Sequence, residues 1–116
     1  MQIRRVQVEG PERTVTLSYT EWGAADSVGT VLCVHGLTRN ARDFDQLAAD
    51  LAAEMRVICP DMVGRGRSDR LMDPEHYVLP TYMSHMVQLI EKMNLDEVDW
   101  VGTSMGGMIG MALAAA

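Results

Sequence analysis

The sequence predicts an α/β fold, with a mostly parallel sheet and an antiparallel hairpin at the N-terminus. Two patterns carry this prediction. The first 22 residues alternate polar and apolar side chains in two stretches joined by a Gly-Pro turn, which is typical of paired strands. Thereafter short apolar runs alternate with stretches of helical spacing. That alternation is typical of parallel strands buried on both faces and joined by helical crossovers.

The elements follow in order along the chain. Apolar side chains at every second position predict strands over residues 3–8 and 14–22. Uninterrupted apolar runs predict buried strands, and apolar residues at i, i+3, i+4 and i+7 predict helices. The expected buried strands are 30–34, 56–59 and 98–101, and the expected helices are 41–54, 81–94 and a last one after a turn at 102. Asn40 is the expected N-cap of the first helix.

The composition is that of a globular domain and excludes several classes of protein. With 116 residues, 47% of them hydrophobic and 22% charged, the chain is neither disordered nor a coiled coil. The net charge is −6 and the basic residues are scattered, so we expect no nucleic-acid partner. No stretch reaches the ~18 apolar residues of a membrane span, and the N-terminus lacks the apolar run of a signal peptide. Cys33 and Cys59 lie inside apolar runs, so we expect a cytoplasmic protein with no membrane partner.

The strongest motif is Gly102-Thr103-Ser104-Met105-Gly106, which matches G-x-S-x-G between a buried strand and a helix. A serine in so tight a turn adopts strained backbone angles, and the flanking glycines let strand and helix approach. Its hydroxyl stands clear of the backbone, beside the free N–H groups of a helix N-terminus. Ser104 is therefore the candidate nucleophile. The alternative interpretation is a glycine-rich turn with a serine N-cap.

A second motif, His35-Gly36-Leu37, ends the third predicted strand. Glycine lets the chain turn tightly there and aim a backbone N–H into the crevice at the end of the sheet. The N–H groups of Leu37 and Met105 are the candidate donors of an oxyanion hole. We interpret His35 as a structural histidine bonded to neighbouring backbone, and not as a general base.

A third motif spans residues 60–69 and contains Gly64-x-Gly66. It does not match a dinucleotide-binding loop, because Asp69 stands where the third glycine belongs and no helix begins there. We expect Asp61 and Ser68 to bond loop backbone beside the site. The loop also carries three arginines that we expect in solvent: Arg65, Arg67 and Arg70.

Other prominent side chains receive structural interpretations. Gly106, Gly110 and Ala114 recur every four residues, which predicts that one face of the last helix lies close to the sheet. His85 is expected on the surface of the second helix. Met108 is expected in the core, the alternative being the lining of an acyl pocket.

Together the three motifs resemble the α/β-hydrolase family over the whole chain. The resemblance implies that Ser104 is the nucleophile and that the Met105 and Leu37 N–H groups form the oxyanion hole. It implies supporting roles for His35, Gly36, Gly102 and Gly106, and it implies no metal or organic cofactor. The motifs are similar to those of small-molecule esterases, enol-lactonases and C–C bond hydrolases. Two features separate the chain from the family's dehalogenases and epoxide hydrolases: a serine nucleophile in place of aspartate, and no proline two residues after the His-Gly pair.

The same resemblance implies an acid and a histidine after the serine, and the 12 residues that follow Ser104 include no Asp, Glu or His. We therefore expect residues 1–116 to be the N-terminal part of one α/β-hydrolase core domain, incomplete at the C-terminus. The later strands, the lid, the acid and the histidine would come from the remainder of the same fold. The expected activity is a serine hydrolase acting on a small carboxylic ester, lactone or related carbonyl substrate through an acyl-enzyme. The alternatives are a C–C bond hydrolase of the ring-cleavage type and a non-catalytic ligand-binding member or inactive fragment.

Overall fold

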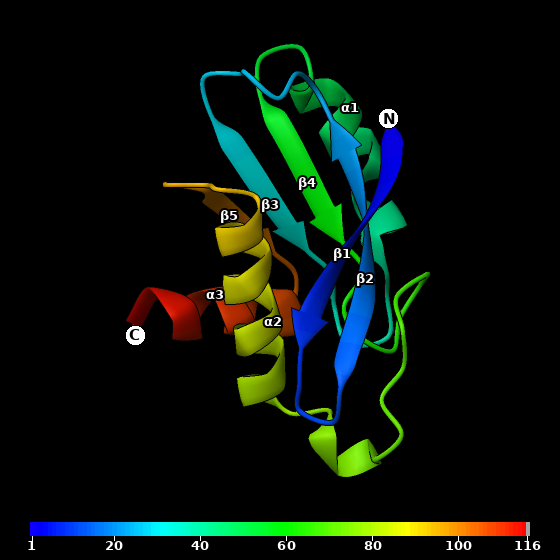
Figure 1. The fold of residues 1–116 in the computed structure, drawn as a ribbon. Helices are drawn as coiled ribbons and strands as arrows, with labels where there is room; N and C mark the ends of the chain where they lie inside the picture. The colour runs from blue at the N-terminus through cyan, green and yellow to red at the C-terminus, as the bar shows by residue number, and fades with distance from the viewer. Residues whose placement is uncertain (116) are drawn as a thin grey trace.

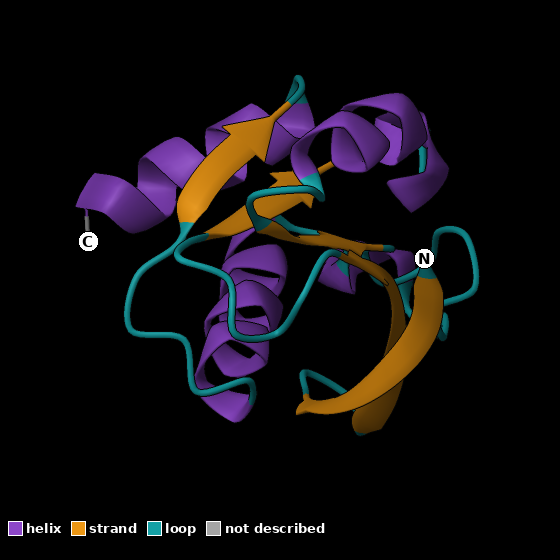
Figure 2. Ribbon diagram, turned by 90° about the horizontal axis from the view of Figure 1, so that it is seen from above, coloured by secondary structure: helices purple, strands orange, loops and turns teal. Residues whose placement is uncertain are grey.

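The computed structural model describes residues 1–115 and shows a five-stranded sheet with helices on both faces (Figures 1 and 2). The strands are β1 (Gln2–Glu9), β2 (Thr14–Trp22), β3 (Thr30–Val34), β4 (Arg56–Pro60) and β5 (Asp99–Gly102). The helices are η1 (Ala41–Phe44), α1 (Asp45–Leu51), η2 (Pro74–His76), α2 (Leu79–Lys92) and α3 (Met105–Ala115), of which η1 and η2 are 3₁₀-helices. The α/β class predicted from the sequence is confirmed.

The strands lie in the order β1-β2-β4-β3-β5. The pairs β1–β2 and β2–β4 are antiparallel, whereas β4–β3 and β3–β5 are parallel. The described sheet is therefore mixed, with the predicted hairpin at one side and three parallel strands at the other. Figure 1 shows β5 at the edge opposite the hairpin, and its free edge carries no strand within residues 1–115.

Alternate side chains of the parallel strands pack into two hydrophobic cores on opposite faces of the sheet. On one face the strands pack against α2 and α3; this core includes Leu32, Val34, Ile58, Met86, Leu89 and Ile109. On the other face they pack against η1 and α1; this core includes Val31, Cys33, Phe44, Ala48, Val57 and Cys59. Burying each large aliphatic side chain contributes about 1.5–3 kcal/mol to folding. Both cysteines are free and buried, as the apolar runs predicted.

The first helix is shorter than predicted. Residues 41–54 form the 3₁₀-helix η1, then α1 and then a turn, and not one continuous helix. The tight first turn is held by two side chains. The Asp61 carboxylate accepts the Ala41 N–H at 2.8 Å, and the Asn40 side chain, the predicted N-cap, accepts the Arg42 N–H at 2.9 Å. Such 3₁₀ turns are common where caps fix a helix start.

The prediction that His85 lies on a helix surface is wrong. Its side chain is fully buried, and its Nε2 lies 2.7 Å from the Gly10 carbonyl oxygen in the hairpin turn. The helix α2 packs on β1, so the hairpin covers a helix face that the local pattern alone assigned to solvent. Burial lowers the pKa of His85, which keeps the imidazole neutral, with Nε2–H donating to Gly10.

The helix α3 is apolar on all sides and packs on the sheet only through part of its surface. Gly110 lies against the Trp100 ring, as the spacing of small residues predicted, but Ala114 is exposed. Met108 and Met111 are exposed on the same helix, so the expectation of a core position for Met108 is wrong. Within residues 1–115, every helix is too short or too polar to cross a lipid bilayer.

Candidate active site

Ser104 lies in the turn between β5 and α3, at the carboxyl end of the parallel strands. Its φ is +51°, in the left-handed region that side-chain-bearing residues rarely adopt, which is the strain predicted for this serine. The Thr103 N–H donates to the Val34 carbonyl at 3.1 Å, and the Gly106 N–H donates to the Thr103 carbonyl at 2.9 Å. These two hydrogen bonds fix the backbone on both sides of Ser104. The Ser104 residue is exposed, so a substrate can reach its hydroxyl.

Gly102 and Gly106 let the strand and the helix approach each other. A Cβ atom on Gly102 would lie 2.4 Å from the Gly106 carbonyl carbon, and one on Gly106 would lie 2.0 Å from the Val34 carbonyl oxygen. Both distances are well inside van der Waals contact with backbone atoms that cannot swing aside. A side chain at either position would therefore push α3 away from the sheet and move Ser104.

The loop after β3 passes directly beside Ser104. A Cβ on Gly36 would lie 3.6 Å from the Ser104 Cβ, and Leu37 and Met105 line the same cavity as Ser104. Within residues 1–115, neither the Leu37 N–H nor the Met105 N–H donates to a protein acceptor. Met105 is also the first residue of α3, where N–H groups have no acceptor within the helix. The structure thus brings the serine and both candidate oxyanion donors to one place.

His35 is a structural histidine in the geometry as well. It is fully buried, its Nδ1 lies 2.7 Å from the Gly36 carbonyl oxygen, and its Nε2 lies 3.0 Å from the Met62 nitrogen. Because Met62 donates its N–H, Nε2 must be the unprotonated nitrogen and Nδ1–H must donate to Gly36. Burial lowers the pKa of His35, which favours this neutral form.

This histidine fixes the peptide plane between Gly36 and Leu37. In a trans peptide the carbonyl oxygen and the N–H point in opposite directions. Holding the Gly36 oxygen toward the His35 ring, with help from the Arg39 N–H at 3.1 Å, therefore directs the Leu37 N–H the other way. Both ring nitrogens of His35 are engaged with backbone, and the bond to Gly36 orients the candidate oxyanion donor.

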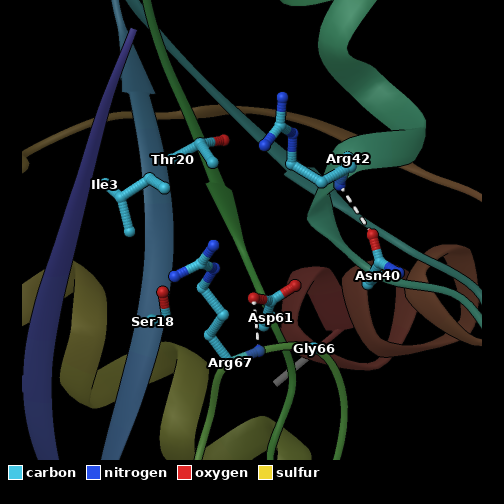
Figure 3. A pocket seen from close by; sticks show the side chains of 8 residues that line it. All are labelled: Ile3, Ser18, Thr20, Asn40, Arg42, Asp61, Gly66 and Arg67. Carbon is cyan, nitrogen blue, oxygen red and sulfur yellow. Dashed lines mark hydrogen bonds between the residues drawn. The ribbon is translucent and has the colours of Figure 1, made fainter.

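Asp61 and Ser68 bond backbone, as predicted. The Asp61 carboxylate accepts the Ala41 N–H and, at 3.0 Å, the Arg67 N–H; the Ser68 hydroxyl donates to the Asp61 carbonyl at 2.6 Å. Figure 3 shows this carboxylate and Arg67 at a second cavity of about 230 Å³. That cavity shares no lining residue with the Ser104 cavity, so the two cavities are separate.

The expectation that all three loop arginines lie in solvent is wrong for Arg65. Arg67 and Arg70 are exposed, but Arg65 is half-buried. Its Nε donates to the Leu37 carbonyl at 2.9 Å, and its Nη1 donates to the Tyr82 hydroxyl and to a loop carbonyl, each at 2.9 Å. Its guanidinium carbon lies 5.6 Å from the ring centre of Tyr77 and 5.2 Å from that of Tyr82.

The cavity beside Ser104 has a volume of about 300 Å³ and mainly apolar walls. Its lining residues are Leu37, Tyr77, Val78, Leu79, Tyr82, Ser104, Met105 and Met108. The segment 77–82, where η2 leads into α2, supplies four of these residues and was not identified from the sequence. Mainly apolar walls with a few polar groups, here the Ser104 hydroxyl and two tyrosines, are typical of a site for a small organic substrate.

The other two histidines bond elsewhere in the structure. His76 lies 2.7 Å from the Glu12 carboxylate, and His85 faces Gly10. The N–H groups of Met72 and Asp73, together with His76, lower the pKa of Glu12 to about 2. No histidine within residues 1–115 lines the Ser104 cavity, so the described residues bring together the candidate nucleophile and the candidate oxyanion donors without a histidine base.

The three parallel strands and the serine turn at their carboxyl ends define the class of protein. Residues 29–116 match the family described as the alpha/beta hydrolase fold, and the chain belongs to this family. Its named relatives are hydrolases.

Among these relatives, the chain is similar to the 3-hydroxybutyrate-oligomer hydrolase of Cupriavidus necator, at 50% identity over 109 residues, which cover 94% of this chain and 37% of that protein. It is 39% identical over 67 residues to the 2-hydroxy-6-oxo-2,4-heptadienoate hydrolase of Pseudomonas putida, covering 56% of this chain and 23% of that one. The X-ray structure of a Rickettsia typhi protein assigned as a hydrolase superposes with a TM-score of 0.95 at 38% identity, covering 99% of this chain and 44% of that one. The chain thus spans less than half the length of these proteins.

Proposed function

We propose that the protein is a serine hydrolase that cleaves a small carboxylic ester, lactone or related carbonyl compound through an acyl-enzyme. The observation that carries the proposal is the strained Ser104 beside two unused N–H groups, those of Leu37 and Met105. The serine oxygen attacks the carbonyl carbon, and the carbonyl oxygen becomes an oxyanion that both N–H groups stabilise. The alcohol leaves, and water then hydrolyses the acyl-enzyme. This chemistry uses no metal or organic cofactor.

A serine nucleophile also needs a base that takes its proton and an acid that orients the base. We propose that residues 1–116 are the N-terminal part of a single core domain and that the remainder of the same fold supplies both groups. The lengths of the relatives support this, since the chain covers 37% of the Cupriavidus protein and 44% of the Rickettsia one. The free edge of β5 is consistent with further strands beside it.

Ester hydrolysis is favoured over carbon–carbon bond cleavage by the more extensive match. The relative that matches 94% of the chain is named as a hydrolase of hydroxybutyrate oligomers, whose units are joined by esters. The second candidate is a C–C bond hydrolase of the ring-cleavage type, favoured by the similarity of 67 residues to the Pseudomonas enzyme. Both reactions would use Ser104 and the same oxyanion hole.

We place the protein in the cytoplasm, with a small-molecule substrate and no nucleic-acid or membrane partner. The free thiols of Cys33 and Cys59 support a reducing compartment. The two side chains share the core on the α1 face of the sheet, and neither is accessible to solvent.

The test compares two chromogenic substrates of the full-length protein. One is the ester 4-nitrophenyl butyrate, and the other is a dienoate of the kind formed by cleavage of an aromatic ring. We expect turnover of the ester, and loss of at least about a thousandfold in kcat for Ser104→Ala. Ser84→Ala, which changes an exposed serine on α2, is the matched control and should keep full activity. Faster turnover of the dienoate would favour the C–C hydrolase. Binding of both compounds without turnover of either would favour the non-catalytic alternative.

A further inference from the structure

We propose that Arg65 makes the Ser104 cavity selective for esters that carry a carboxylate, with the guanidinium attracting that second charged group. The inference rests on the proposed function, since it names the substrate class of the same site. It starts from the loop arginine that the structure places against the wall of the Ser104 cavity.

The position of Arg65 is set by contacts with three residues that line the Ser104 cavity. Its Nε donates to the carbonyl of Leu37, and Leu37 lines the cavity. Its guanidinium lies over the rings of Tyr77 and Tyr82, which also line the cavity. These two cation–π contacts, together with the hydrogen bonds to Leu37 and Tyr82, hold the planar cation in one orientation. The positive charge is therefore fixed behind the wall that faces the substrate.

The charge of Arg65 has no carboxylate partner within residues 1–115. In that part of the chain only two arginines, Arg56 and Arg65, are not exposed. Arg56 pairs with the Glu21 carboxylate at 2.8 Å. The acceptors around Arg65 are two backbone carbonyls and a tyrosine hydroxyl, all of them neutral. Withdrawing a cation from water is unfavourable unless an anion compensates it, and here no protein anion does.

One edge of the guanidinium is still available. Nε and Nη1 are engaged, whereas Nη2 donates to none of the described residues. The walls of the Ser104 cavity are mainly apolar, with Leu37, Val78 and Leu79 among them, so the field of a cation behind them is weakly screened inside the cavity. Arg65 does not itself line the cavity, so its charge acts from behind the wall, and a carboxylate is the group that such a charge attracts most strongly.

These features define the substrate class. It is an ester with an apolar chain for the cavity, a scissile carbonyl for Ser104 and a carboxylate for Arg65. The half ester of a dicarboxylic acid has this chemistry, and so does a short oligomer of a hydroxy acid, which has ester links and one terminal carboxylate.

The test uses two esters that differ in charge and hardly in shape: mono-4-nitrophenyl glutarate, which is anionic, and 4-nitrophenyl methyl glutarate, which is neutral. The readout is the ratio of their kcat/KM values, so that a general loss of activity from loosening Leu37 cancels. In the full-length protein we expect a ratio of at least about ten in favour of the anion. Arg65→Gln should lower the ratio about tenfold, and Arg65→Lys, which keeps the charge, should restore part of it.

Arg67→Gln is the matched control. Arg67 belongs to the same loop but lines the separate cavity of Figure 3, so its removal should leave the ratio unchanged. An unchanged ratio of kcat/KM values in Arg65→Gln, or an equal fall of that ratio in Arg67→Gln, overturns the inference. Arg65 would then serve only to hold the Leu37 backbone in place. Failure of the unchanged protein to cleave either ester overturns the proposed function and this inference with it.

Discussion

His35 offers a prediction in which stability and activity should separate. The ring makes two hydrogen bonds, a donor bond from Nδ1 to the Gly36 carbonyl and an acceptor bond from the Met62 N–H to Nε2. The amide of asparagine can take the place of Nδ1–H, and the carbonyl of glutamine can take the place of Nε2. His35→Asn therefore keeps the bond to Gly36, and His35→Gln keeps the bond to Met62.

The expected losses of stability and of kcat follow from the hydrogen bond that each variant loses. In His35→Asn the buried Met62 N–H loses its acceptor, which costs about 1–3 kcal/mol of stability. In His35→Gln the Gly36 carbonyl still accepts the Arg39 N–H, so the loss is smaller, about 0.5–1.5 kcal/mol. Activity should follow the opposite order. Only His35→Gln frees the peptide that carries the Leu37 N–H, and since losing one oxyanion donor costs about a hundredfold to a thousandfold in kcat, loosening it should cost about ten- to a hundredfold.

The assay is urea unfolding of each full-length variant, with kcat for the neutral glutarate ester measured beside it. We expect His35→Asn to be the less stable variant and His35→Gln to be the less active one. If kcat and stability fall in the same order, the role of His35 in positioning Leu37 is refuted, and the ring serves only to fill the core.

Three further outcomes follow from the geometry. Gly106→Ala should destabilise the protein by at least ~2 kcal/mol in urea unfolding, because the new methyl would lie 2.0 Å from the Val34 carbonyl oxygen; a neutral effect would contradict the close approach of α3. Ser104→Gly should be about 1 kcal/mol more stable than Ser104→Ala, because only glycine adopts a φ of +51° without strain; equal stabilities in thermal unfolding would show an unstrained turn. Burial places the folded-state pKa values of His35 and His85 below the unfolded value of about 6.5. The contribution of the two histidines to the free energy of unfolding is therefore complete above that pH and is lost as the pH falls below it. The loss should reach up to about 1.4 kcal/mol per pH unit for each histidine, and His85→Gln should remove about half of the slope; an unchanged slope would mean that His85 titrates normally in the folded state.

The serine turn could be predicted from the sequence because all its determinants are local. The strand, the two glycines and Ser104 are contiguous, and the observed strain follows from their spacing. The same holds for His35 and Gly36, whose bond joins adjacent residues. Burial of β3 and β4 also follows from local apolar runs, whereas the prediction of a buried strand at 98–101 is wrong, because β5 lies at the sheet edge and has no fully buried residue.

The sequence pattern did not reveal features that depend on packing between distant segments. His85 is buried because the hairpin, 75 residues away in sequence, covers its helix face. The setting of Arg65 depends on Tyr77 and Tyr82, which reach the loop only once η2 and α2 are in place. The cavity wall formed by residues 77–82 was not predicted for the same reason. These residues match no motif in the sequence, and only the folded chain brings them beside Ser104.

The central claim is that Ser104 is the nucleophile, and a covalent label tests it most directly. The full-length protein would be treated with a fluorophosphonate, digested and sequenced by mass spectrometry. We expect one adduct on the peptide that contains Ser104, and no adduct in Ser104→Ala. Labelling that persists in Ser104→Ala, or that maps to another residue of the full-length protein, would contradict the assignment.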